Sequence, residues 1–95
     1  MTWKTWYKEH LFTPAQAVQQ IKSGQRVVVA HACGEPSIIL DALVANAAQY
    51  ENVEIIHMVA MGKAAYCQPQ YDNNFHHNAF FLGGSTRAAA AEGRV

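Results

Sequence analysis

Two short apolar runs on either side of a helical pattern limit the folds open to this chain more than any other feature. Residues 26–31 and 53–59 are rich in β-branched side chains and show no alternation between apolar and polar residues. Runs of this kind are typical of strands that are covered on both faces in a parallel sheet. Between them, residues 37–49 place Leu40 and Leu43 on one apolar helical face. A strand, a crossover helix and a second parallel strand are therefore predicted.

Two helices are predicted before the first strand. Trp3, Trp6 and Tyr7 recur at helical spacing, which predicts a short amphipathic helix with an aromatic stripe. A second helix begins in residues 13–16, because the order Thr-Pro-Ala-Gln contains the elements of a capping box. This helix is expected to end at Gly24, since glycine tolerates the left-handed conformation that follows many helices.

The last part of the chain predicts a third strand and a final helix. Residues 68–74 are polar and irregular, which favours a surface excursion, and residues 79–82 form the third apolar run. Ser85 or Thr86 is expected to cap a helix that Gly93 ends. The order of elements predicts an α/β fold with an open, mainly parallel sheet and flanking helices.

The length and the charge of the chain limit its domain organisation and the partners to be expected. Ninety-five residues make one small domain at most, and the predicted sheet has bare edges, so an incomplete N-terminal α/β domain is expected. Seven basic and seven acidic side chains cancel without any Lys/Arg block, so neither nucleic acid nor a membrane is an expected partner. No signal-peptide pattern is present, so a cytoplasmic location with two free thiols is expected.

Three loops that follow the predicted strands form the candidate site. In open α/β sheets, ligands bind beyond the carboxyl ends of the strands, so these loops are expected to share one edge of the sheet. The first two loops supply candidate substrate-binding residues: His31, Gly34, Glu35, Met61, Gly62 and Lys63. The third loop supplies candidate anion-binding residues: Gly83, Gly84, Ser85 and Thr86.

The anion-binding predictions have plainer alternatives. The third loop places two glycines before a capping hydroxyl, so free backbone N–H groups there can face a carboxylate or a phosphate. It lacks the Lys of a P-loop, and an ordinary strand-to-helix turn has the same residues. Lys63 can contact an anionic substrate or acyl oxygen, or it can be a solvated surface lysine.

The first loop also raises two catalytic hypotheses. Cys33 can act as a nucleophile assisted by His31 or His57, although a small thiol near a strand end is more often an apolar filler. A zinc site of the deaminase type needs a paired cysteine motif downstream, whereas Cys67 stands alone, so no metal is expected.

The remaining polar groups of the chain favour structural interpretations. Glu35 can be a catalytic carboxylate or a solvated one, and Gly34 and Pro36 are expected to shape the backbone, by close approach and by starting a helix. His76 and His77 are adjacent, so on a strand they point to opposite faces, which disfavours the binding of one metal ion by both.

Three motifs resemble the acetyl-CoA hydrolase/transferase family. They are HACGEP at residues 31–36, HMVAMGKAAYC at residues 57–67, and GGSTR at residues 83–87 with EGR at residues 92–94. Within that family the motifs are most similar to those of the 4-hydroxybutyrate CoA-transferases, and the resemblance covers residues 6–95. It implies a longer two-domain enzyme with an active site between its domains.

The resemblance also implies an activity. Such enzymes move coenzyme A between an acyl-CoA and a small carboxylate, such as 4-hydroxybutyrate or acetate, through a glutamyl-CoA intermediate. The nucleophilic glutamate and the coenzyme-binding glycine motif belong to the C-terminal half of the family, so no catalytic residue is assigned within residues 1–95. His31, Gly34 and Glu35, with the second loop, are expected to form the N-terminal wall of the crevice.

The resemblance also implies which molecules bind to this chain. Coenzyme A and its esters are substrates, no bound cofactor is expected, and the C-terminal half of the same enzyme and a second copy of the chain are expected partners. The 95-residue chain alone is expected to be inactive. The alternatives are an acyl-CoA hydrolase, or a non-catalytic oligomerising or binding module that uses its open sheet edge and the stripe of Trp3 and Trp6.

Overall fold

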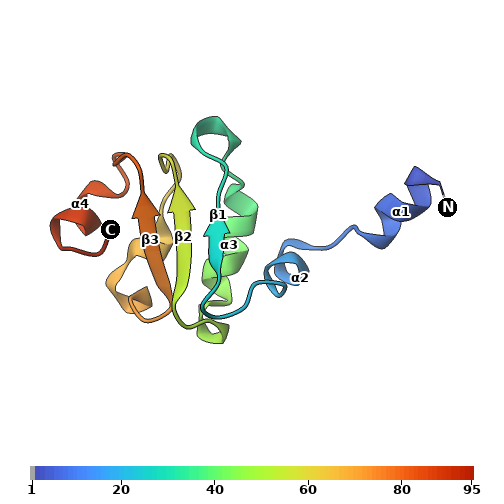
Figure 1. The fold of residues 1–95 in the computed structure, drawn as a ribbon, viewed down its shortest axis with the longest axis horizontal. Coiled ribbons are helices and arrows are strands. Elements are labelled where there is room, and N and C mark those ends of the chain that lie inside the picture. Colours follow the sequence, from blue (N-terminus) through green and yellow to red (C-terminus); the bar gives the residue numbers. More distant parts are fainter. Residues whose placement is uncertain (1) are drawn as a thin grey trace.

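The computed structural model describes residues 2–95 as one three-stranded parallel sheet with helices packed beside it (Figure 1). The strands lie in the order β1-β2-β3, so the sheet is open and α/β in class, as predicted. The strands are β1 (Arg26–Val28), β2 (Val53–His57) and β3 (Phe75–Ala79). The helices are α1 (Trp3–Glu9), α2 (Pro14–Val18), α3 (Ser37–Ala45) and α4 (Arg87–Ala91).

The central strand β2 sets the register of the sheet. Val27 of β1 and His77 of β3 both lie opposite Ile55, which is fully buried. The side chains of one face pack against α3 and the segment after β2, and they form the core together with Leu40 and Leu43. The predicted crossover helix between β1 and β2 is therefore confirmed, although it ends at Ala45 and a single 3₁₀ turn follows it.

The position of the third strand was predicted wrongly. The strand is β3, whereas residues 80–82 follow it and expose their large apolar side chains. Phe75 and His77 are buried while His76 and Asn78 are exposed, so the strand alternates with a period of two. A search for a continuous apolar run overlooks a strand whose outward positions are polar.

Within residues 2–95 the sheet is covered on one face only, so the prediction of strands buried on both faces was wrong. Val28 in β1 is exposed on the other face. There, Nε of Arg26 donates to a carboxylate oxygen of Glu54 at 2.8 Å, and Nδ2 of Asn78 donates to the other oxygen at 3.0 Å. These exposed polar contacts link all three strands across the open face.

The sequence signals for helix ends are largely confirmed. Oγ1 of Thr13 accepts from the backbone N–H of Gln16 at 3.2 Å, and Oε1 of Gln16 accepts from the N–H of Thr13 at 2.9 Å, which is the predicted capping box. The helix it starts, α2, ends earlier than predicted, at Val18. Gly93, at φ +79°, directly follows the C-cap of α4 and is the expected left-handed stop. Gly24, at φ +81°, lies in a later turn, so the prediction that it ends α2 was wrong.

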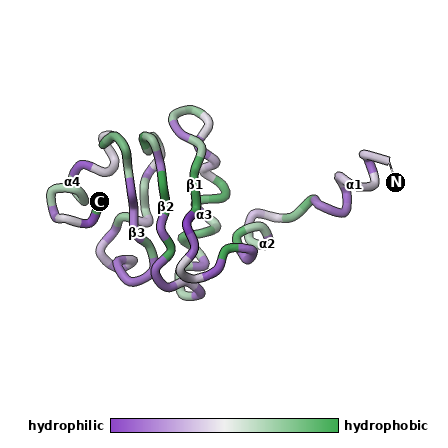
Figure 2. The backbone as a smooth tube through the Cα atoms, viewed as in Figure 1, coloured by the Kyte–Doolittle hydropathy of each residue, from purple (hydrophilic) through white to green (hydrophobic). Residues whose placement is uncertain are grey.

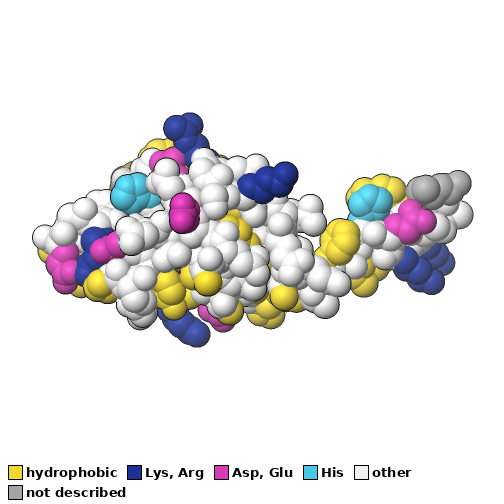
Figure 3. Space-filling view, turned by 90° about the horizontal axis from the view of Figure 1, so that it is seen from below, with side chains coloured by type: hydrophobic (Ala, Val, Ile, Leu, Met, Phe, Trp, Pro, Cys, Tyr) yellow, Lys and Arg dark blue, Asp and Glu magenta, His cyan; other side chains and the backbone are white. Residues whose placement is uncertain are grey.

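Helix α1 and the residues up to α2 form an arm that stands away from the sheet (Figure 1). The arm makes the molecule elongated, with extents of 51 × 27 × 17 Å. Trp3 and Trp6 are 73% and 54% exposed, and Trp6 stacks on His10 with a centroid distance of 4.2 Å. In the space-filling view, the arm carries apolar, basic and acidic side chains together (Figure 3).

Apolar residues also gather where the strands end. The segments that follow the carboxyl ends of β2 and β3 are coloured as hydrophobic in Figure 2. They include Met58, Met61, Phe80 and Phe81, all of which are exposed. Among residues 2–95, no helix has both the length and the apolar character needed to cross a membrane.

Candidate functional site

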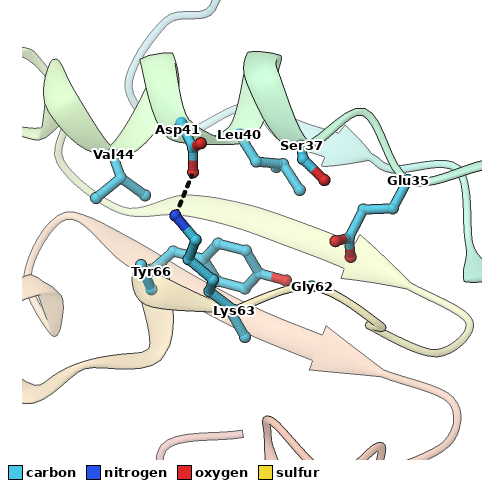
Figure 4. A pocket seen from close by; sticks show the side chains of 10 residues that line it. Glu35, Ser37, Leu40, Asp41, Val44, Gly62, Lys63 and Tyr66 are labelled. Atoms are coloured by element: carbon cyan, nitrogen blue, oxygen red, sulfur yellow. Dashed lines mark ion pairs between the residues drawn. The ribbon is translucent and has the colours of Figure 1, made fainter.

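A pocket of about 240 Å³ lies beside the carboxyl end of β2 (Figure 4). Its walls are the first two turns of α3 on one side and residues 62–66 on the other. Glu35 lies at one end of the pocket, and Lys63 and Asp41 lie toward the other (Figure 4). The first and second predicted loops therefore meet in one site, as the parallel strand order implies.

Glu35 is the most buried charged group of the site, with a side chain that is only 7% exposed. Its Oε1 lies 3.2 Å from Nε2 of His57, but the contact lacks the alignment of a hydrogen bond. The carboxylate also lies directly over Gly62, where a Cβ atom would overlap Oε2. Because any side chain at Gly62 would displace the carboxylate, the close approach expected at Gly34 occurs here instead.

His57 ends β2 and is fully buried behind Glu35. Its Nδ1 lies 3.1 Å from the hydroxyl of Tyr66. Burial lowers the pKa of His57, against the smaller opposing effect of the Glu35 carboxylate, so the imidazole is neutral at pH 7. Burial raises the pKa of Tyr66, which keeps its hydroxyl protonated.

These directions indicate how the proton positions are arranged. A carboxylate only accepts hydrogen bonds, so a neutral His57 is most stable with its proton on Nε2, facing Glu35. Nδ1 is then an acceptor, and the Tyr66 hydroxyl donates to it. Tyr66, His57 and Glu35 thus form a chain of polar groups in which Tyr66 and Glu35 line the pocket and His57 lies fully buried between them.

His77 completes the buried polar cluster from β3. Its ring centroid lies 5.6 Å from that of His57 and 5.0 Å from that of Tyr66. Neither ring nitrogen has a hydrogen-bond partner within residues 2–95. Burial, with the nearby His57, lowers the pKa of His77 to about 4. His76 is exposed on the opposite face, as expected for adjacent residues of a strand.

Other residues of the first loop lie at the surface. His31 and Cys33 are exposed, so Cys33 is not the buried apolar filler that was expected. His57, the other histidine considered as a base for Cys33, contacts Glu35 and Tyr66. The left-handed residue of this loop is Ala32, at φ +55°, whereas a Cβ at Gly34 would make only an ordinary contact at 3.7 Å. The Cys67 thiol is buried, and this burial raises its pKa to about 11.

The second loop contributes exposed side chains to the pocket rim. Met61 is exposed, and Lys63 has a side chain that is 81% exposed. Nζ of Lys63 lies 3.9 Å from Oδ1 of Asp41, which is a surface ion pair (Figure 4). In water such a pair contributes little, so the Lys63 ammonium is available to another anion at the rim.

The third loop lies close against Ala60, the residue that precedes the second loop. A Cβ atom at Gly83 would lie 2.5 Å from the carbonyl oxygen of Ala60, so glycine is required there. Thr86 is fully buried, and its hydroxyl donates to the Gly83 carbonyl at 3.3 Å instead of capping α4. Gly84 and Ser85 are exposed beside them.

Sequence reasoning missed Tyr66 and His77, and it assigned His57 only to a thiol nucleophile. His57 and His77 occupy inward positions two residues after Ile55 and Phe75, which are themselves buried. Two histidines at inward positions of neighbouring strands are the signal that could have indicated a buried cluster.

Comparisons with known proteins cover the whole chain. The family model described as the acetyl-CoA hydrolase/transferase N-terminal domain matches residues 1–95. The 4-hydroxybutyrate coenzyme A transferase of Clostridium kluyveri is 49% identical over 95 residues, which are 100% of this chain and 22% of that protein. The chain therefore spans about a fifth of the length of this curated relative.

Two solved structures share the fold. The crystal structure of RipA from Yersinia pestis has a TM-score of 0.83 at 24% identity, and a mutant of RipA has a TM-score of 0.85 at 24% identity. Each comparison covers 98% of this chain and 22% of the other chain.

Proposed function

The chain belongs to the acetyl-CoA hydrolase/transferase family, and on this premise we propose that it forms the N-terminal part of a coenzyme A transferase. The observation that carries the proposal is the match of the family's N-terminal domain to the whole of residues 1–95. The name of the relative from Clostridium kluyveri supports 4-hydroxybutyrate as a carboxylate substrate, and we propose this acid or another small carboxylate, such as acetate, as the acceptor. Coenzyme A and its esters are then substrates, with no other bound group required.

The proposed reaction divides one exchange into easier steps. A glutamate outside residues 1–95 attacks the thioester carbonyl, the coenzyme A thiolate leaves, and a mixed anhydride forms. The thiolate then attacks the glutamyl carbonyl, which releases the first acyl group as a carboxylate and leaves a glutamyl-CoA thioester. The acceptor carboxylate repeats these steps in reverse, so the thiolate ends on the new acyl group and the glutamate is regenerated.

This chain contributes the N-terminal wall of the crevice in this proposal. Glu35 and Gly62 lie together in the pocket, and Lys63 is at its rim. His31, Gly34 and Met61 lie nearby in the same two loops and are proposed to face the substrate. The third loop, with residues 83–86, is proposed to bind an anionic group of the substrate through its backbone.

A chimera tests the proposal. Residues 1–95 replace the matching part of the Clostridium kluyveri relative, and exchange from acetyl-CoA to 4-hydroxybutyrate is followed by chromatography of the acyl-CoA products. We expect exchange by the chimera and none by the 95-residue chain alone. A folded chimera without exchange, beside an active parent enzyme, contradicts the proposal.

The same assay separates a transferase from a hydrolase. Without an acceptor carboxylate, a transferase stops at the glutamyl-CoA thioester and releases no free thiol, whereas a hydrolase keeps releasing free thiol from acetyl-CoA. A thiol-reactive dye measures that release. Continuous release at the rate of exchange would assign the chain to an acyl-CoA hydrolase.

A second candidate function follows from the arm. Trp3, Trp6, Leu11 and Phe12 are exposed on it, and exposed apolar clusters of this kind mark protein interaction sites. The chain in this case is a binding or assembly module that pairs with itself or with another chain. A monomeric molar mass by light scattering, at all concentrations measured, counts against this function.

A further inference from the structure

The inner end of the pocket carries a negative charge that none of its described lining residues, all within residues 35–66, neutralises. Glu35 forms this end, and its neighbour His57 is a neutral imidazole because burial lowers its pKa. Asp41 and Lys63 form an exposed ion pair toward the opposite end, and Lys63 is the one cation among the described residues that line the pocket. An anion bound at the inner end would therefore meet repulsion at short range.

The remaining lining suits an uncharged aliphatic group. Leu40, Val44 and Ala64 contribute apolar side chains to the pocket lining. A slender alkyl chain would cover these apolar surfaces, and a hydroxyl or an amide N–H at its end would reach an acceptor. Hydrogen bonds to a charged partner in a partly buried site are stronger than those between neutral groups.

We propose that this pocket binds a neutral aliphatic group bearing a hydroxyl or an amide N–H, with Glu35 as the acceptor and His57 as a positioning residue. The identity of the molecule that carries this group rests on the proposed function. An acyl-CoA has two such donors: the hydroxyl of a hydroxyacyl chain, and the amides of the pantetheine arm. The pocket itself is formed wholly within residues 35–66.

His57 and Gly62 place the acceptor from two sides. Tyr66 fixes Nδ1 of His57, so its Nε2–H attracts Oε1 of Glu35 over 3.2 Å without forming an aligned hydrogen bond. Both carboxylate oxygens therefore keep the capacity to accept from a ligand. Gly62 leaves the space that Oε2 occupies.

Matched probes test the acceptor in the complete 95-residue chain. Methyl 4-hydroxybutyrate and methyl butyrate are both uncharged esters and differ only by one hydroxyl. We expect the hydroxy ester to bind about tenfold more tightly, as expected for one hydrogen bond to a charged acceptor. Chemical-shift changes of the backbone amides of residues 62–66 measure both affinities. Pantetheine in a third titration distinguishes the two sources of the donor.

Variants distinguish the role of Glu35, the acceptor, from that of His57, which positions it. Glu35→Met removes the acceptor at similar volume and is expected to abolish the preference for methyl 4-hydroxybutyrate over methyl butyrate. His57→Leu is expected to lower it, while His57→Gln, which keeps an N–H donor, retains part of it. Retention by Gln and loss with Leu would not follow if His57 only filled space. His76→Leu changes an exposed histidine of the open face and is the matched control.

Gly62→Ala gives a test that removes no polar group. The added methyl displaces the Glu35 carboxylate, so the preference should fall although Glu35 and His57 both remain. Dispersed amide spectra establish that each variant is folded. If His57→Leu does not fold, Gly62→Ala still tests whether the position of the Glu35 carboxylate sets the preference.

Three results would overturn the proposal. They are equal affinities for the two esters, no binding of either ester, and tighter binding of the butyrate anion than of its methyl ester. The last would assign the pocket to an anion held by Lys63. None of these outcomes depends on the exchange assay, so the transferase proposal can fail while the donor preference stands, and the reverse.

Discussion

Acid should destabilise this protein through His77, and the variant His77→Leu should remove most of that effect. Burial lowers the pKa of this histidine to about 4, while the unfolded chain has the ordinary value near 6.5. Between these two pH values the unfolded state holds a proton that the folded state does not. His77 therefore causes no loss of stability above about pH 6.5, and the free energy of unfolding decreases as the pH falls from there toward 4.

The magnitude follows from the same interval. It spans roughly 2.5 pH units, and each unit is worth about 1.4 kcal/mol for one proton, so His77 accounts for about 3 kcal/mol. The pKa of His57 is lowered as well and adds to the loss in the same direction. Since a chain of this size is stable by roughly 5–14 kcal/mol, a loss of this size is a large part of the total.

Urea unfolding followed by far-ultraviolet circular dichroism, at about pH 7 and about pH 4.5, measures the effect. The wild-type chain should lose most of the 3 kcal/mol, and His77→Leu should lose much less. At neutral pH the variant should be at least as stable, because it removes two ring nitrogens that have no partner within residues 2–95.

The neighbouring variant His76→Leu is the control, since this side chain is exposed on the opposite face. It should keep the acid dependence of the wild type. If the wild type is equally stable at both pH values, or if His77→Leu keeps the full dependence, the account of the buried cluster is refuted.

Three further outcomes are expected. Gly83→Ala should destabilise the fold by roughly 1–3 kcal/mol in thermal unfolding, because its Cβ would meet the Ala60 carbonyl, whereas Gly84→Ala should be nearly neutral; equal effects would contradict the packing described. Cys33 should react quickly with a thiol-reactive dye, whereas Cys67 should react only on unfolding, because it is buried with its pKa raised to about 11. Thr13→Ala should cost about 1 kcal/mol in urea unfolding through loss of the capping box, and no measurable change would argue against that cap.

Local signals predicted the helix starts and the first two strands. Thr13 and Gln16 contact each other within one turn, so their role follows from spacing alone. The parallel order of the strands also followed, because a helix of the right length separates the first two. The third strand did not follow, since its outward residues are polar and the apolar residues after it are exposed.

The candidate site was predicted in its location but not in its chemistry. Glu35 and Gly62 were both expected at the strand ends, yet their contact depends on how the loop before α3 folds over the segment after β2. His77 and Tyr66 reach His57 only through the pairing of β2 with β3 and through the turns between these strands. Contacts of this kind depend on tertiary structure, and spacing along the chain does not contain them.

The arm has a consequence for spectroscopy. Both tryptophans of the chain lie on α1, whereas the aromatic residues of the core are tyrosines and a phenylalanine. Intrinsic tryptophan emission therefore reports the surroundings of the arm and is nearly blind to melting of the sheet. A blue shift of that emission would mark the moment when another polypeptide surface covers Trp3 and Trp6, while three of the four tyrosines, Tyr50, Tyr66 and Tyr71, report on the core.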